Sequence, residues 1–226
     1  MEKPVKWGIL GGAKIAHTQF LPALADARNA VLHAVGSRSA MKAEAVAEEW
    51  GAPRAYGSYE AVLADAEVEA VYVPLPNNMH HEWTIKALRA GKHVLCEKPM
   101  ALNVEQCREM LQTAQAEGRL FMEAFMYRFH PQIFKVQELI QSGRIGRVQL
   151  IRGSFSFFLD DETNIRLAPG LGGGSLMDVG CYPISFANLI FGELPERVKA
   201  AGVYRLDSPD IDLTMCGILE YSQGGL

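Results

Sequence analysis

Short apolar runs alternate with longer amphipathic segments up to about residue 125 of the chain. Apolar runs bounded by Gly, Pro or Asn are typical of strands, and apolar residues at every third or fourth position are typical of helices. Their alternation predicts an α/β fold, in which a doubly wound parallel sheet carries helices on both faces. The predicted strands are 5–10, 31–36, 68–73, 93–96 and 120–125, and the predicted helices are 13–27, 40–50, 59–63, 81–89 and 104–116.

The pattern changes after about residue 130. Two predicted strands without a helix between them indicate an antiparallel sheet, and an alternating segment before them is typical of a half-buried strand. Pro183 either kinks the last helix or lies near its start. We expect helices at 131–142 and 175–191, strands at 148–157, 198–205 and 213–221, and a Gly-rich loop at 159–174.

This change of pattern predicts two domains, 1–126 and 127–226. The second is expected to be an α+β domain with an open, mostly antiparallel sheet. A turn signal at Gly224-Gly225 is followed by no further strand. We therefore expect this second sheet to be incomplete.

Composition excludes several classes of protein. The net charge is −4 and the sequence has no long Lys/Arg run, which argues against nucleic acid and anionic membrane surfaces as partners. No apolar run is long enough to span a bilayer, and the first residues show no signal-peptide pattern. The four cysteines are scattered without a C-x-x-C pair, which favours reduced thiols. We expect a cytoplasmic protein.

A glycine turn follows the first predicted strand. It matches the dinucleotide-binding pattern G-x-G-x-x-G/A with Ala13 at the middle glycine, and Ala16 allows close packing of helix on strand. The helix that follows would direct its N-terminus at a pyrophosphate. The alternative is a tight turn that binds no ligand. The expected cofactor contacts are Gly11, Gly12, Ala13, Lys14 and Ile15.

The end of the second predicted strand indicates which dinucleotide binds. An NAD site usually has Asp or Glu there, to bind the ribose 2′-hydroxyl. This chain has Ser37 and Arg38 and no acid. A hydroxyl and a guanidinium suit a 2′-phosphate, which favours NADP.

The loop 74–80 follows the next long apolar run. Asn77 and His80 could contact the ribose or nicotinamide side of the cofactor, and helix capping by Asn77 or Asn78 is an equal alternative. The pair His80-His81 suggests a metal, but no third ligand stands at a suitable spacing. We expect no metal site.

Glu97-Lys98-Pro99 follows the strand predicted at 93–96. Proline ends the ladder, so Lys98 is expected at the carboxyl edge of the sheet, where ligands of open parallel sheets bind. A chemical role for this lysine is favoured. The alternative is a solvated lysine in an ordinary turn.

A second informative stretch runs from Gly172 to Tyr182. Its three glycines let the backbone pass close to a ligand, and Ser175 can cap the next helix. In a helix, Asp178 and Tyr182 share a face and form a proton-handling pair. The equal alternative is a capping Asp and a core Tyr.

Together with Lys98 this pair indicates a mechanism. Tyr has a reference pKa of about 10, and a nearby ammonium favours the phenolate. Lys98, Asp178 and Tyr182 would then handle an alcohol proton while hydride moves to a nicotinamide.

These motifs, in this order, resemble the Gfo/Idh/MocA oxidoreductases, and within them the NADP-dependent D-xylose and dihydrodiol dehydrogenases. The resemblance spans essentially the whole chain. It rests on Gly8-Ile9-Leu10-Gly11, Pro76-Asn77 with His80, Glu97-Lys98-Pro99, Met122 to Arg128, and Gly173-Gly174 with Asp178-Val179-Gly180 and Tyr182.

The resemblance implies a Rossmann domain followed by a domain whose open sheet often forms a homodimer. It implies Lys98 near the substrate hydroxyl, Asp178 orienting the substrate and Tyr182 as acid/base. The substrate would be a sugar, such as D-xylose or D-glucose, or a cyclic diol. Arg128 and Arg166 would lie by the nicotinamide and substrate, although Ile165 stands where relatives commonly have Trp. Further cofactor contacts are expected from Leu75, Pro76, Asn77, His80, Glu97 and Lys98.

Relatives in this family are longer, so the chain is expected to lack strands that complete the second domain. Two alternatives to a dehydrogenase therefore stay open. One is a non-enzymatic NADP-binding sensor or regulator, and the other is an inactive fragment of the same fold.

Overall fold

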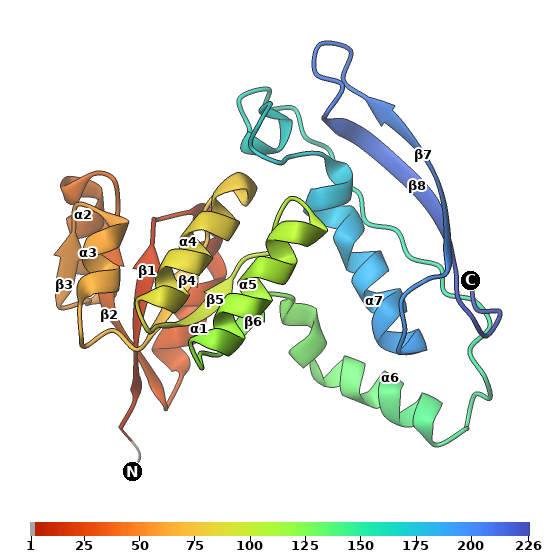
Figure 1. The fold of residues 1–226 in the computed structure, drawn as a ribbon, viewed down its shortest axis with the longest axis horizontal. Helices are drawn as coiled ribbons and strands as arrows, with labels where there is room; N and C mark the ends of the chain where they lie inside the picture. Colours follow the sequence, from red (N-terminus) through yellow and green to blue (C-terminus); the bar gives the residue numbers. More distant parts are fainter. Residues whose placement is uncertain (1–2) are drawn as a thin grey trace. The chain divides into compact units, whose positions relative to one another are not determined.

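The computed structural model describes residues 3–226. The chain divides into two compact units, which we call the N-terminal unit, ending at Ala124, and the C-terminal unit, Phe125–Leu226 (Figure 1). The boundary expected from the sequence lies two residues further along. No helix within residues 3–226 is both long enough and apolar enough to cross a membrane.

The N-terminal unit is built on a six-stranded sheet in which every pairing is parallel. This confirms the predicted parallel sheet. One strand, β3, was not predicted, because its three residues are too short and too polar to give a signal. The strands, in the spatial order β3-β2-β1-β4-β5-β6, are β1 (Val5–Leu10), β2 (Ala30–Gly36), β3 (Arg54–Tyr56), β4 (Ala70–Val73), β5 (His93–Cys96) and β6 (Phe121–Glu123).

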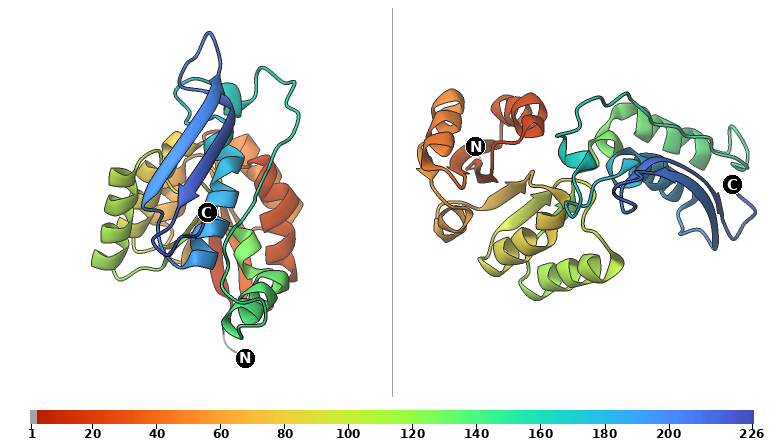
Figure 2. Two further views of the ribbon diagram at one scale, coloured as in Figure 1. Left: turned by 90° about the vertical axis from the view of Figure 1, so that its right-hand side faces the viewer. Right: turned by 90° about the horizontal axis from the view of Figure 1, so that it is seen from above.

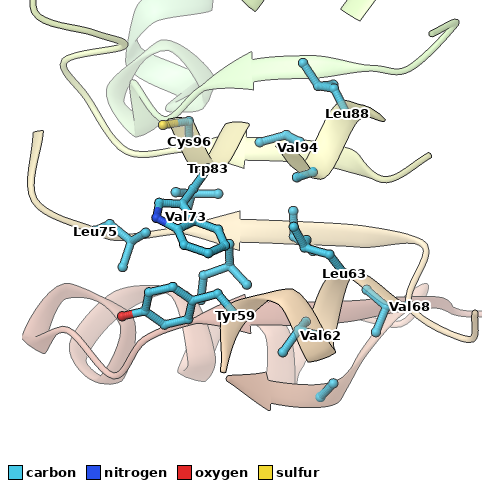
Figure 3. Close-up of a cluster of buried hydrophobic side chains, with 14 of the residues drawn as sticks. Tyr59, Val62, Leu63, Val68, Val73, Leu75, Trp83, Leu88, Val94 and Cys96 are labelled. Atoms are coloured by element: carbon cyan, nitrogen blue, oxygen red, sulfur yellow. The ribbon is translucent and has the colours of Figure 1, made fainter. Parts of the chain in front are cut away.

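Helices cover both faces of this sheet, as the view from above in Figure 2 shows. They are α1 (Leu21–Asp26), which follows the π-helical turn Ala16–Phe20, and α2 (Ala40–Trp50), α3 (Tyr59–Ala64), α4 (Asn77–Arg89) and α5 (Val104–Ala116). On one face Ile9, Val35 and Tyr72 pack against α1 and α2. On the other, Val73 and Val94 pack against α3 and α4 (Figure 3). Ala114 of α5 belongs to the same cluster.

The alternation of buried side chains between the two faces explains why the apolar runs are nearly continuous. All four residues of β4 are buried, and each fully buried aliphatic side chain contributes about 1.5–3 kcal/mol to stability. Gly8 and Gly36 allow α3 to lie close to the sheet. A Cβ atom on either would lie 2.6 Å or 2.5 Å from the Val62 side chain.

The C-terminal unit consists of helices and one antiparallel pair of strands. Its helices are α6 (Pro131–Gln141) and α7 (Cys181–Phe191), with the π-helical turn Leu176–Gly180 directly before α7. β7 (Arg197–Tyr204) and β8 (Asp212–Glu220) form the antiparallel sheet that the sequence predicts.

Tyr221, the residue that follows β8, packs against α7. The ring centroids of Phe191 and Tyr221 are 4.3 Å apart, and the Tyr221 hydroxyl donates to Asn188 Oδ1 at 2.7 Å. Pro183 is the third residue of α7, so it lies near the helix start, where a missing N–H is best tolerated.

The strand predicted at 148–157 is wrong. This segment has no regular structure, and its backbone pairing is limited to Leu226: the Ile151 N–H donates to the Leu226 carbonyl at 2.8 Å, and the Leu226 N–H to the Gln149 carbonyl at 3.2 Å. A strand needs a neighbour along its whole length, and no other segment among residues 3–226 pairs with it.

Candidate active site

The glycine turn lies where the strand order of the sheet reverses, between β1 and β4. This switch point is where open α/β sheets bind their ligands. Gly11 has φ +96°, a conformation that favours glycine, and its N–H donates to the Gly36 carbonyl at 2.7 Å. Gly12 and Lys14 are exposed, and Ala13 and Ile15 are half-buried. The turn is therefore open at the edge of the sheet.

Ser37 and Arg38 follow β2 at the same edge, directly before α2. The Ser37 hydroxyl accepts the Ser39 N–H at 3.3 Å, and the Arg38 side chain is exposed. No acidic residue stands at this strand end. The structure brings the glycine turn, a hydroxyl and a guanidinium to neighbouring strand ends, a set that suits a dinucleotide with a 2′-phosphate.

Lys98 follows β5, and the residue before it is held in place. The Tyr72 hydroxyl donates to Glu97 Oε1 at 2.6 Å, and the Glu97 N–H donates to the Val73 carbonyl at 3.1 Å. Tyr72 is itself stacked on Phe20 of the π-helical turn, with ring centroids 4.0 Å apart. Burial raises the pKa of Glu97, and burial together with the Glu97 carboxylate raises the pKa of Tyr72. Glu97 thus has a structural partner within the sheet.

The residue after Lys98 is held as well. Pro99 follows a cis peptide bond, and its carbonyl oxygen lies 2.8 Å from Nδ1 of His80. Nε2 of the same imidazole lies 2.7 Å from the Leu75 carbonyl oxygen, and the ring is fully buried. The expected contact of His80 with the cofactor stays a prediction. Both of its ring nitrogens face carbonyl groups of the protein.

The asparagines before His80 do not cap α4. Pro76 is the residue before the helix, without a side-chain cap, and Asn77 and Asn78 are the first two helical residues. His81 is turned to Glu109, with 2.8 Å between Nε2 and Oε2. Within residues 3–226 no three potential metal ligands gather. The expected roles of Leu75, Pro76 and Asn77 at the cofactor are untested predictions.

In the C-terminal unit, Asp178 lies in the π-helical turn and pairs with Arg166. Arg166 Nε donates to Asp178 Oδ2 at 2.5 Å, and the carboxylate is nearly buried. Asn164 Oδ1 accepts the Arg166 N–H at 3.1 Å, which anchors the segment that carries the guanidinium. Arg166 was expected beside nicotinamide and substrate, but its Nε is used by Asp178. Arg128 is exposed in the 3₁₀ turn Met126–Phe129.

Tyr182 is surrounded by aromatic rings. Its ring centroid lies 5.5 Å from that of Phe125, 6.0 Å from Tyr127 and 5.4 Å from Phe155. Its hydroxyl lies 3.6 Å from the sulfur of Met126. Four positions separate it from Asp178 along one continuous helical stretch. The phenol ring is thus surrounded by aromatic rings, and its hydroxyl donates to the Met126 sulfur, a weak acceptor.

Sequence reasoning missed Asp212, the first residue of β8. Its Oδ2 accepts the Ser175 hydroxyl at 2.6 Å and the Leu176 N–H at 2.7 Å. A carboxylate from another element therefore caps the helix that carries Asp178 and Tyr182, and Ser175 does not cap it. No local signal connects residues 37 apart.

Gly173 and Gly174, which precede this helix, lie very close to other residues of the C-terminal unit. A Cβ atom on Gly173 would lie 2.1 Å from the Arg166 carbonyl oxygen, and one on Gly174 would lie 2.1 Å from Asp212 Oδ1. The space beside these two glycines is thus filled by the backbone of Arg166 and the carboxylate of Asp212. A close approach of the Gly172–Gly174 backbone to a ligand stays a prediction.

The three predicted catalytic residues belong to different units. Lys98 is part of the N-terminal unit, and Asp178 and Tyr182 are part of the C-terminal unit. Within each unit the fold holds these residues in place. The residues on either side of Lys98 are hydrogen-bonded, and Asp178 and Tyr182 lie on a helix that Asp212 caps.

Two family models match the chain. The first is described as an oxidoreductase family with an NAD-binding Rossmann fold and matches residues 5–125, and the second is the GFO/IDH/MocA C-terminal domain and matches residues 133–226. The chain belongs to the Gfo/Idh/MocA family. The membership expected from the motifs is thereby confirmed.

Similar members of the Gfo/Idh/MocA family are named for sugar or diol chemistry. A D-xylose 1-dehydrogenase (NADP(+)) of Haloferax volcanii is 44% identical over 96% of this chain, and a trans-1,2-dihydrobenzene-1,2-diol dehydrogenase of Xenopus tropicalis is 37% identical over 96%. This chain spans 66% of the length of each. A 3-ketoreductase of Actinomadura kijaniata, crystallised with NADP and TDP-benzene, superposes with a TM-score of 0.90 at 35% identity, covering 99% of this chain and 68% of that one.

Proposed function

We propose that this protein is an NADP-dependent oxidoreductase that transfers hydride between the hydroxyl-bearing carbon of a sugar or cyclic diol and a nicotinamide. The observation that carries the proposal is Lys98 at the carboxyl edge of the sheet, anchored on both sides through Glu97 and Pro99. An ordinary solvated lysine in a turn would need no such support. The names of the similar dehydrogenases support the same reaction class.

NADP is the proposed cofactor. Gly11 to Ile15 would hold the pyrophosphate, with the backbone of the turn and the N-terminus of the following helix as donors. Ser37 and Arg38 would hold the 2′-phosphate, since the exposed guanidinium can make paired charge-assisted bonds to it. When bound, the nicotinamide ring would accept the hydride.

The protein residues would handle the proton of the substrate hydroxyl. Tyr182 would take this proton as a phenolate, and the Lys98 ammonium would stabilise that phenolate and orient the hydroxyl. Asp178 would accept a hydrogen bond from the substrate. Arg166 would hold the Asp178 carboxylate in position, because Nε donates to it at 2.5 Å. For an aldose the oxidised carbon would be C1, giving a lactone.

Dimerisation through the C-terminal sheet belongs to the same proposal. β7 is exposed along its whole length and β7–β8 is a two-stranded sheet, so both sheet edges and one face can receive a second copy. A cytoplasmic location stays a prediction from the sequence.

The direct test measures NADP⁺ reduction by the purified chain with D-xylose, D-glucose and a cyclic diol. We expect reduction with at least one substrate. Lys98→Ala and Tyr182→Phe should each lower kcat by about 10²-fold or more, since each removes a group that handles the proton. NADPH affinity should be nearly unchanged in Tyr182→Phe.

Two results would contradict the dehydrogenase. Turnover that survives both substitutions would remove the proposed roles. NADPH binding without reduction of any substrate would favour the sensor.

Cofactor choice has a test of its own. Ser37→Asp places a carboxylate where the 2′-phosphate would lie, so the ratio of NADP to NAD affinity should fall by about tenfold or more. Ser39→Asp, two residues further along, is the matched control. An unchanged ratio in Ser37→Asp would overturn the assignment of NADP to this strand end.

A further inference from the structure

His80 is the most completely buried ionisable imidazole beside the proposed site, and the reaction does not use it. His80 lies in the first turn of α4, and its ring lies between the loop after β4 and the loop after β5. Nδ1 lies 2.8 Å from the Pro99 carbonyl oxygen, and Nε2 lies 2.7 Å from the Leu75 carbonyl oxygen.

One of these loops carries Lys98, and the other contacts the glycine turn. Pro99 directly follows Lys98. Leu75 lies against the glycine turn, since its Cδ2 atom is 3.4 Å from the position of a Cβ on Gly11. One imidazole therefore connects the segment that carries the lysine with the segment that contacts the cofactor turn.

Both partners of this ring are acceptors. A carbonyl oxygen accepts hydrogen bonds and donates none, so both contacts are hydrogen bonds only when both ring nitrogens carry hydrogen. Burial lowers the pKa of His80, and the Lys98 ammonium lowers that pKa further. A neutral ring carries one N–H and serves one of the two carbonyls.

We propose that His80 is a positioning residue for Lys98, acting through a hydrogen bond from Nδ1–H to the Pro99 carbonyl. The inference rests on the proposed role of Lys98 in catalysis. The loop after β5 has a support on each side of the lysine: Tyr72 holds Glu97, and His80 holds Pro99. Loss of either support frees one end of a three-residue segment.

A pair of substitutions separates the two contacts of the ring. The amide nitrogen of Asn occupies the place of Nδ1, and the amide nitrogen of Gln occupies the place of Nε2. His80→Asn can therefore place a donor at the Pro99 carbonyl and none at the Leu75 carbonyl, and His80→Gln does the reverse. Each variant leaves one buried carbonyl without a donor, so a merely structural role predicts similar losses of Tm in both.

Positioning predicts an asymmetry in turnover. In His80→Gln we expect kcat at saturating substrate to fall by about 10-fold to 100-fold, because a displaced catalytic group loses rate steeply. The KM for substrate and the affinity for NADPH should stay within about threefold. In His80→Asn, kcat should stay within about threefold of the unchanged protein. Equal kcat losses in the two variants would overturn the proposal.

A second readout does not depend on activity, so failure of the proposed function can be recognised separately. Lysines are labelled with a limiting amount of an amine-reactive reagent, and the rate at each lysine is read by mass spectrometry. The rate at Lys98 should change by about threefold or more in His80→Gln and not in His80→Asn. Lys42, exposed on α2, is the internal control. Equal Lys98 rates in the two variants would again contradict positioning.

The unchanged protein supplies a third measurement, for the case in which a variant fails to fold. The ¹⁵N shifts of the His80 ring report which nitrogen carries hydrogen at neutral pH. We expect hydrogen on Nδ1. A ring with hydrogen on Nε2 alone would leave the Pro99 carbonyl without its donor and would overturn the inference.

Discussion

The two units of this chain hold their candidate residues by different means. In the N-terminal unit the strands are sandwiched between helices, and all three clusters of buried apolar side chains found within residues 3–226 lie there. In the C-terminal unit β7 is exposed at every residue and α6 has no buried one. Its central helix is held by polar contacts with Asp212, Arg166 and Tyr221.

This difference shows what each unit needs to keep a side chain in place. An apolar core tolerates small changes at many positions, because its stability is spread over many contacts. A helix held by a few hydrogen bonds depends on each donor, each acceptor and the room between them. Single changes should therefore be most damaging at the polar contacts of the C-terminal unit.

The largest effect is expected at Gly174. Its φ is +94°, and a Cβ atom there would meet Asp212 Oδ1 at 2.1 Å. Gly174→Ala should lower the free energy of unfolding by about 3 kcal/mol or more, because it adds a clash to the backbone strain. Amide hydrogen exchange should become faster across 175–191 and stay unchanged in the sheet of the N-terminal unit.

Gly192 is the matched control for Gly174. It also has positive φ, at +72°, but no atom lies within 4 Å of its Cβ position. Gly192→Ala should lower the free energy of unfolding by about 1 kcal/mol, because it adds backbone strain but no clash. Equal losses in the two variants would show that Asp212 does not fill this space.

A valine pair measures the contrast between the two sheets. Val71 of β4 is 0% exposed and Val198 of β7 is 59% exposed. Val71→Ala should lower the free energy of unfolding, measured in urea, by about 2–3 kcal/mol, because it removes buried apolar surface and leaves a cavity. Val198→Ala should change stability by about 0.5 kcal/mol or less. A loss at Val198 as large as at Val71 would mean that β7 is covered in solution.

The smallest effect is a pH dependence at Glu97. Burial raises its pKa in the folded chain above that of the unfolded chain, so the folded state binds more protons between the two values. Stability from this group is therefore lost as pH rises through the folded pKa.

Glu97→Gln should remove the loss of stability that Glu97 causes as the pH rises. The variant should match the unchanged protein below about pH 4, where both carry a neutral group, and be slightly more stable at neutral pH. Thermal unfolding across this pH range measures the difference. A variant that is less stable at neutral pH would show that the charged carboxylate supports the fold there.

Much of the N-terminal unit could be predicted because its signals are local. Short apolar runs predicted five of its six strands, and the glycine turn and Lys98 lie at strand ends that can be recognised from neighbouring residues. The start of α4 was placed too late, since Asn77 and Asn78 read as a cap and are helical. β3 has only Arg54, Ala55 and Tyr56, which carry no periodic pattern.

The rest depends on contacts between distant residues. Alternation at 148–157 predicted a strand, yet a ladder also needs a partner, which sequence pattern does not report. The pairing of Arg166 with Asp178 and the two carbonyl contacts of His80 arise from how segments meet in the fold. His80 stood in a motif and was noticed, but its burial was not evident from the residues around it.

The cap by Asp212 also has a consequence for the order of events during synthesis. The helix tip at Ser175 and Leu176 leaves the ribosome well before its carboxylate partner, because 37 residues separate Ser175 from Asp212. Until β8 has been made, the Ser175 hydroxyl and the Leu176 N–H lack this acceptor. The segment with Asp178 and Tyr182 therefore reaches its final form late, when the hairpin closes behind it.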